Sequence, residues 1–303
     1  MTNRNPASSS SLPHGWLVLD KPLGLSSAAA VGIVRRKFGG MKAGHGGTLD
    51  PLATGILPIA LGEATKTTAY AMGAEKSYEF EVIWGKQTAT DDAEGEVIAT
   101  SDIRPDEAAI KVALPAFIGV IDQTPPAFSA VKIDGKRAYA MARAQQDMPV
   151  LKSRPIRIDD LRLLEAMPDS AHFAVDCGKG AYIRSLARDL GLYLGSRAYV
   201  SALRRTKVGQ FSLKNAISLD FLENLSDSAA APSYVMPVLA ALDDIPALSI
   251  SPEEAQKLRF GQLLEMKLPM ADASIYKAVC EGVLIALIEV RDASLKPIRV
   301  FNL

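Results

Sequence analysis

The sequence is poor in cysteine and histidine. Its 303 residues include two cysteines, Cys177 and Cys280, which are too few for a disulfide framework. The three histidines (His14, His45 and His172) are scattered, and no cysteine or histidine lies at a spacing that suits zinc. We therefore expect neither a disulfide scaffold nor a metal enzyme.

The chain also lacks a long apolar run. No stretch reaches the roughly 20 apolar residues that a membrane helix needs. Residues 1–13 are rich in Ser and Asn without an apolar core, which predicts a disordered tail and not a secretory signal. The hydrophobic fraction of 48% is typical of a globular protein. We expect a cytoplasmic protein, and a monomer because no apolar interface stripe is evident.

A formal net charge of zero hides an uneven distribution. Residues 131–220 carry sixteen Lys and Arg against nine Asp and Glu, whereas residues 73–130 carry four against eleven. A basic region in a neutral protein is typical of a surface that binds a polyanion, although charge runs are more often ordinary solvated surface.

Hydrophobic periodicity predicts an α+β fold with a mixed or antiparallel sheet. Expected strands cover residues 16–20, 77–85, 95–99, 156–165 and 171–177, with 95–99 paired to 77–85 across an acidic loop at 90–94. Expected helices run from Ser26 or Ser27 to about Phe38, and over 63–72, 106–118 and 181–194. The prolines at 125 and 126 exclude a regular central strand there. Residues 229–247 resemble a linker region, and 248–303 a small β-rich domain.

The most distinctive stretch is a glycine-rich loop at residues 44–55. It places one carboxylate, Asp50, among four glycines, and Pro51 restricts Asp50 to an extended backbone. Taken alone, such a stretch is either a structural turn whose Asp caps the next helix or a loop that wraps a ligand. It matches neither a Walker A motif nor a dinucleotide-binding fingerprint.

Several motifs, in the same order, resemble the TruB family of tRNA pseudouridine-55 synthases of bacterial type. They are LDKPLGLSS at 19–27, GHGGTLDP at 44–51, QTPPAFSAVK at 123–132 with GKRAY at 135–139, CGKGAYIRSLA at 177–187 and LRR at 203–205. The resemblance spans about residues 14–215. One departure is Gly46, where the family is expected to have Thr or Ala, and it affects only the stiffness of the loop.

The resemblance implies a pseudouridine synthase catalytic domain over 14–228 and a PUA-like domain over 248–303. The implied reaction converts uridine in the T-loop of tRNA, at position 55, into its C-glycoside isomer after the base is flipped out. Cleavage of the glycosidic bond builds positive charge at the sugar carbon, so one carboxylate is chemically sensible without a metal or organic cofactor. The implied partner is the T-arm of tRNA.

The resemblance also implies roles for individual residues. Asp50 is the catalytic carboxylate, and Arg184 is the cation beside it, although by itself Arg184 reads as an exposed helix charge. Tyr78 is expected to stack on the flipped uracil, or else to be an ordinary core tyrosine.

Four further residues are expected to contact the substrate. Leu203 is an apolar lid over the base or simply a core leucine. His45 is a wedge that stacks on a loop base, or a loop histidine that bonds to backbone. Lys21 supports the catalytic loop or contacts RNA, and Tyr182 lies within the arginine motif. The basic excess in 131–220 would contact phosphates, and the acidic stretch 91–96 would lie away from RNA.

Two other functions remain open on the sequence. An RNA-binding or tRNA-folding module would explain the basic region and the small C-terminal domain equally well. A glycosylase is disfavoured because these enzymes usually need a second carboxylate, and none lies inside the matched motifs.

Overall fold

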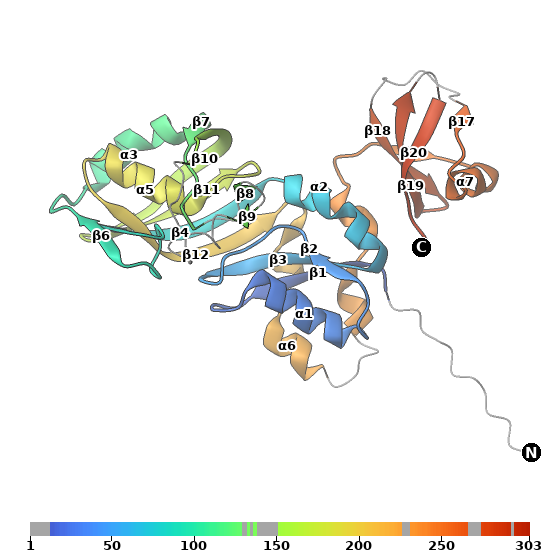
Figure 1. The fold of residues 1–303 in the computed structure, drawn as a ribbon, viewed down its shortest axis with the longest axis horizontal. Helices are drawn as coiled ribbons and strands as arrows, with labels where there is room; N and C mark the ends of the chain where they lie inside the picture. Colours follow the sequence, from blue (N-terminus) through green and yellow to red (C-terminus); the bar gives the residue numbers. More distant parts are fainter. Residues whose placement is uncertain are drawn as a thin grey trace, which may run out of the picture.

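The computed structural model describes residues 13–128, 132–133, 136–137, 151–225, 231–265, 274–291 and 294–303. The predicted tail, residues 1–13, lies almost entirely outside them. Within the described residues, a large mixed sheet forms the main body, and a smaller sheet near the C-terminus is set apart from it beyond α2 (Figure 1).

The large sheet brings together strands that are distant in the sequence. Its main path within the described residues is β14 (Ile217–Ser218), β1 (Gly15–Lys21), β3 (Ala53–Leu61), β12 (Ala198–Val208), β4 (Lys76–Trp84), β11 (Ser170–Cys177), β10 (Arg154–Ala166) and β7 (Gly119–Gln123). Short strands add to it as β2 (Ala43–His45) on β3, β13 (Phe211–Ser212) on β12 and β15 (Val235–Met236) on β1. The β3–β12 and β1–β14 pairs are parallel and the β12–β4, β4–β11 and β11–β10 pairs antiparallel, which confirms the predicted mixed sheet.

The four predicted helices are present with ends near the predicted residues, and α6 and α7 were not predicted. The α-helices are α1 (Ser27–Lys37), α2 (Thr68–Gly73), α3 (Glu107–Ala113), α5 (Ile183–Tyr193), α6 (Leu219–Asn224) and α7 (Pro252–Arg259). The 3₁₀ helices are η1 (Gly62–Thr67), η2 (Leu114–Phe117), η3 (Leu213–Asn215), η4 (Ala231–Tyr234) and η5 (Val238–Ala241). The Ser26 side chain accepts a hydrogen bond from the Ala29 amide at 3.2 Å, so Ser26 is the N-cap of α1.

Two local predictions were wrong. Residues 95–99 do not pair with 77–85, because β6 (Val97–Thr100) pairs with β5 (Lys86–Thr88), and β4 lies instead between β11 and β12. Residues 44–55 are not one loop, since both ends are strands and only residues 46–52 connect them. We call residues 46–52 the Asp50 loop.

The C-terminal sheet has the order β16 (Ala247–Ser249), β18 (Ile275–Cys280), β19 (Val283–Arg291), β20 (Ser294–Val300) and β17 (Leu264–Glu265) within the described residues. A further two-stranded pair is β8 (Lys132–Ile133) with β9 (Lys136–Arg137). The predicted linker region is described from residue 231 onward. Its strand β15 joins the large sheet, and Val238 and Leu242 are buried in an apolar cluster with Trp16 and Phe301. This region therefore packs onto the main body.

The main apolar core lies on one face of the large sheet, under α1 and α5. Leu19, Val34, Leu57, Phe173 and Leu186 belong to this one buried cluster. Because α5 packs on β12, the arginine motif that begins α5 is held close to the strand that carries Leu203.

Candidate active site

The Asp50 loop lies where two central strands of the sheet begin to pair. Parallel pairing of β3 with β12 sets Leu203 opposite Ala53 and Arg205 opposite Gly55. The loop comes directly before β3, so the Asp50 side chain lies close to the Leu203–Arg205 segment. Asp50 lines two cavities, of about 360 Å³ and about 260 Å³.

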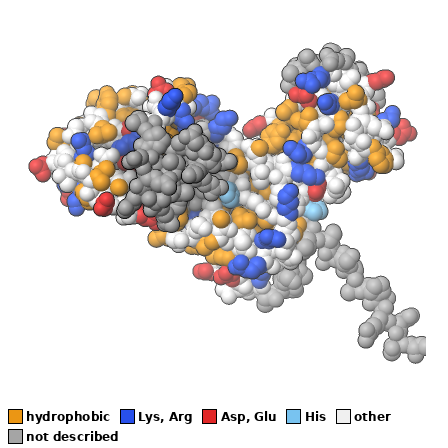
Figure 2. Space-filling view, viewed as in Figure 1, with side chains coloured by type: hydrophobic (Ala, Val, Ile, Leu, Met, Phe, Trp, Pro, Cys, Tyr) orange, Lys and Arg blue, Asp and Glu red, His pale blue; other side chains and the backbone are white. Residues whose placement is uncertain are grey.

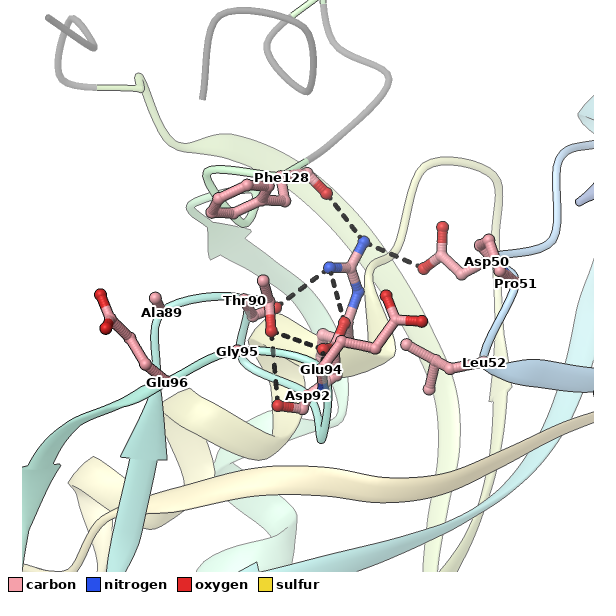
Figure 3. A pocket seen from close by; sticks show the side chains of 11 residues that line it. Asp50, Pro51, Leu52, Ala89, Thr90, Asp92, Glu94, Gly95, Glu96 and Phe128 are labelled. Carbon is pink, nitrogen blue, oxygen red and sulfur yellow. Dashed lines mark hydrogen bonds and ion pairs between the residues drawn. The ribbon is translucent and has the colours of Figure 1, made fainter. Parts of the chain in front are cut away.

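Arg184 connects Asp50 to the rest of the larger cavity. Its Nη2 lies 2.9 Å from Asp50 Oδ2, and its Nη1 lies 3.1 Å from Asp92 Oδ2 (Figure 3). The same guanidinium donates to the carbonyls of Thr90 at 3.0 Å and Phe128 at 2.9 Å. The side chain of Arg184 is 5% exposed and that of Asp50 is 37% exposed. The predicted cation beside Asp50 is therefore buried, and the carboxylate faces the cavity.

Asp92 is a site residue that the sequence reasoning missed. Its side chain is 2% exposed, and its Oδ1 accepts hydrogen bonds from the Thr90 hydroxyl and the Glu94 amide. The neighbouring Asp91, at φ 57°, is paired with Arg188 at 2.9 Å. Burial raises the pKa of Asp91, and Arg188 opposes this.

The acidic stretch at 91–96 lines the larger cavity, and our expectation that it lies away from bound RNA stays a prediction. Asp92, Glu94 and Glu96 border it together with Asp50. Asp92 is nevertheless unlike the second acid of a glycoside hydrolase, because it is buried and ion-paired with Arg184.

The smaller cavity brings Asp50 together with Tyr78, Tyr182, Leu203 and Arg205. Tyr78 and Leu203 are largely buried, at 8% and 7% exposed. Burial is the main cause that raises the pKa of the Tyr78 hydroxyl, and Arg205 opposes it. Apolar and aromatic side chains thus line the same cavity as the carboxylate.

Tyr182 is fixed at the start of α5, where it is the N-cap residue. The Gln123 side-chain oxygen accepts a hydrogen bond from the Tyr182 amide at 2.8 Å, and its nitrogen donates to the Tyr182 carbonyl at 3.1 Å. The Arg154 guanidinium lies 5.3 Å from the centre of the Tyr182 ring.

Lys21 lies beside the Asp50 loop, where its side chain is fully buried. Its ammonium donates to the carbonyls of Leu25 at 2.8 Å, Pro22 at 2.9 Å and Pro51 at 3.3 Å. Burial lowers the Lys21 pKa from 10.5 to about 8, although nearby Asp50 opposes the shift. These contacts are those expected of a residue that supports the Asp50 loop, and a contact of Lys21 with RNA stays a prediction.

His45 lies on β2 and does not line either cavity that contains Asp50. It pairs with Ile59, and its Nδ1 accepts a hydrogen bond from the Gly47 amide at 3.4 Å. The backbone contact that we considered for this histidine is therefore present, and its role as a wedge stays a prediction.

The basic excess of residues 131–220 is partly internal. Arg184 and Arg205 are buried, and Arg188 is bound to Asp91 and Asp189. These three cations are therefore not available to contact phosphates, and counting charges in the sequence overestimated the basic surface.

The described residues contain no group of three or more His, Cys, Asp and Glu placed to hold a metal ion. No helix among them is long and apolar enough to cross a membrane.

Comparison with known proteins identifies close relatives over nearly the whole chain. Residues 35–183 match the model of the TruB family pseudouridylate synthase N-terminal domain, and residues 184–245 match the tRNA pseudouridylate synthase B C-terminal domain. The tRNA pseudouridine synthase B of Caulobacter vibrioides is 48% identical over 301 residues, covering 95% of this chain and 96% of that protein. The protein of the same name from Rhodospirillum rubrum is 48% identical over 299 residues, covering 96% of this chain and 97% of that protein.

The fold is also similar to that of solved structures. A chain in the crystal structure of a Cbf5-Nop10-Gar1 complex aligns with a TM-score of 0.73 and 25% identity, covering 96% of this chain and 85% of that chain. A chain of an H/ACA RNP bound to a substrate RNA containing 2'-deoxyuridine aligns with a TM-score of 0.74 and 22% identity, covering 96% and 86%.

Proposed function

The chain belongs to the TruB family of pseudouridylate synthases, and from this premise we propose that it isomerises uridine to pseudouridine in the T-loop of tRNA, at position 55. The observation that carries the proposal is the contact between Asp50, open to two cavities, and the buried Arg184 at 2.9 Å. A hydrogen-bonded ion pair with a buried guanidinium fixes the position of the Asp50 carboxylate at the cavity.

The chemistry requires three changes at one nucleotide. The bond between N1 and C1′ breaks, the uracil rotates while it remains bound, and C5 then bonds to C1′. C5 loses its proton and N1 gains one, so the reaction is an isomerisation that consumes no other molecule. Asp50 supplies the anionic oxygen that stabilises or traps the positive charge at the sugar carbon. Since no redox equivalent or co-substrate is needed, we propose that the enzyme works without a metal or organic cofactor.

The smaller cavity suits the flipped base. Tyr78 offers an aromatic face and Leu203 an apolar one, and both lie next to Asp50. Stacking of a base on an aromatic side chain is worth about 1–3 kcal/mol, which offsets part of the few kcal/mol that unstacking a nucleotide costs. Tyr182 borders the same cavity, and we assign it to the binding of the flipped nucleotide.

Apart from the flipped nucleotide, the RNA would lie outside these cavities. Figure 2 shows Lys and Arg side chains gathered on the main body below the C-terminal unit, where they would contact phosphates. We assign His45 to a contact with a T-loop base after the uridine has left the stack. We propose that the enzyme acts on tRNA in the cytoplasm. We also propose that the enzyme is a monomer.

The proposal is tested on an unmodified tRNA transcript. Uridine and pseudouridine have the same mass, so the product is mapped by a chemical derivatisation that distinguishes them. We expect one pseudouridine, at position 55 of the T-loop, and none in a transcript whose uridine at that position is replaced by cytidine. Pseudouridine at another position would contradict the assigned substrate, and RNA binding without any pseudouridine would favour an RNA-binding module.

A further inference from the structure

The backbone of the Asp50 loop is held by two side chains, those of Arg205 and Ser27, to which we have assigned no step of the proposed chemistry. Arg205, on β12, donates from Nη2 to the Gly47 carbonyl and from Nη1 to the Thr48 carbonyl, both at 3.1 Å. Its Nε donates to the Ile56 carbonyl at 2.7 Å. One guanidinium thus contacts the loop before Asp50 and the strand after it.

Ser27, the first residue of α1, holds the residue directly before Asp50. Its hydroxyl accepts a hydrogen bond from the Leu49 amide at 2.8 Å and lies 2.8 Å from the Leu49 carbonyl. Ser27 is 3% exposed, so water does not compete for these contacts.

The guanidinium of Arg205 is costly to bury. Arg205 is 1% exposed, and among the described residues no carboxylate forms an ion pair with it. An apolar side chain of similar size would pack there without this desolvation cost. However, an apolar side chain has no donors, whereas three N–H groups of the planar Arg205 guanidinium donate to three separate carbonyls.

The register of the sheet ties this contact to the wall of the smaller cavity. Arg205 lies opposite Gly55 on β3 and opposite Tyr78 on β4. Gly55 has φ +101°, and a Cβ there would lie 2.2 Å from the Arg205 carbonyl oxygen. Glycine therefore allows β12 to approach β3 closely enough for Arg205 to reach beneath the loop.

We propose that Arg205 and Ser27 are positioning residues, which fix the backbone at residues 47–49 and so hold the Asp50 carboxylate in place relative to Arg184 and Tyr78. This inference rests on the proposed function. Arg184 acts on the Asp50 side chain, whereas Arg205 and Ser27 act on the main chain that carries it. A shift of about 1 Å in a reacting group can lower a rate about 100-fold.

Two variants test the proposal without large changes in volume. Arg205→Lys keeps the charge, but one ammonium cannot reach all three carbonyls. Ser27→Ala removes only the hydroxyl. The matched control is Arg204→Lys, because Arg204 is on the opposite face of β12, where it pairs with Asp20 at 2.7 Å.

The first readout is steady-state formation of pseudouridine. We expect kcat to fall about 100-fold in Arg205→Lys and about tenfold in Ser27→Ala, with KM unchanged, because the RNA contacts stay in place. The control should keep its kcat. The second readout is amide hydrogen exchange of residues 46–52 in the RNA-free protein, which should become faster in both variants and not in the control.

Two outcomes would overturn the proposal, and a third would refute the function on which it rests. Unchanged kcat in both variants of an active enzyme would overturn it. Faster exchange throughout the protein, with kcat falling only as the folded fraction falls, would reduce Arg205 to a stabilising residue and also overturn it. Absence of pseudouridine from the wild type would instead refute the proposed function, and the exchange measurement would still decide whether the two residues hold the loop.

Discussion

Arg184 has two carboxylate partners, and the structure predicts that they contribute unequally to stability. Asp92 is 2% exposed, whereas Asp50 is 37% exposed. Replacing Asp92 with asparagine leaves the buried guanidinium with one solvated carboxylate and two carbonyls. Replacing Asp50 leaves it with the buried carboxylate. The Asp92 change should therefore be the more damaging.

The magnitudes follow from burial. Removing one partner of a buried ion pair costs about 3–5 kcal/mol, and Asp92→Asn should cost about 3 because Arg184 keeps its other contacts. Asp50→Asn should cost at most about 1 kcal/mol, since its carboxylate is already partly solvated. The matched control is Asp160→Asn, because Asp160 forms an exposed pair with Arg162 at 2.8 Å.

The assay is equilibrium unfolding in urea, with the free energy of unfolding extrapolated to water for the wild type and the three variants. Equal losses for Asp92→Asn and Asp50→Asn, or a larger loss for Asp50→Asn, would refute the conclusion that the buried carboxylate anchors Arg184. A loss of similar size in Asp160→Asn would show that the effect is not specific to the site.

Three further predictions concern residues around the Asp50 loop. A Cβ on Gly46 would lie 2.8 Å from the Ala71 Cβ, so Gly46→Ala should destabilise by about 1–3 kcal/mol, and adding Ala71→Gly should recover part of this in urea unfolding. Burial lowers the Lys76 pKa from 10.5 to about 8. Between these pH values Lys76 is therefore protonated in the unfolded state and largely neutral in the folded state. The free energy of unfolding of the wild type, relative to Lys76→Met, should therefore rise by at most about 1.4 kcal/mol per pH unit in that window. In an Asp50→Asn background, Tyr78→Phe should keep its affinity for RNA, and Tyr78→Leu should lose about 1–3 kcal/mol.

Each of these predictions has a clear contrary result. The double variant would contradict this if it lost as much unfolding free energy as the two single variants together, because the added Cβ at position 46 would then not collide with Ala71. A difference between wild type and Lys76→Met that falls with pH would mean that Lys76 is stabilised as a cation. Equal affinities for the Phe and Leu variants of Tyr78 would argue against stacking.

The sequence predicted those helices and strands that depend on residues close together in the chain. The alternation of buried and less buried residues in β4 and the Ser26 cap of α1 are both visible within a few residues of sequence. The strand β3 was missed because eight of its nine residues are buried, which removes the alternation, and because it contains Pro58. Pro58 is tolerated there because the neighbour of β3 changes from β12 at residues 53–55 to β2 at 59–61.

The sequence predicted those site residues that lie within the recognised motifs or were assigned by resemblance to the family. Asp50, Arg184, Tyr78, Tyr182 and Leu203 are brought together around two adjoining cavities. Their roles in catalysis and binding stay predictions.

Long-range contacts could not be predicted from local patterns. Asp92 and Arg184 are 92 residues apart, and no local pattern signals that they meet. Arg205 lay within a recognised motif, but a role for it could have been inferred only from its position two residues after Leu203, on the same face of a strand.

Asp50 is the residue to which we assign the isomerisation of uridine in RNA. The most direct test incubates a T-arm stem-loop with wild type, Asp50→Asn and Asp160→Asn, and measures pseudouridine by derivatisation and RNA affinity in parallel. We predict pseudouridine from the wild type and from Asp160→Asn, none from Asp50→Asn, and similar RNA affinity in all three. Pseudouridine formed by Asp50→Asn at the wild-type rate would show that Asp50 is not the catalytic carboxylate.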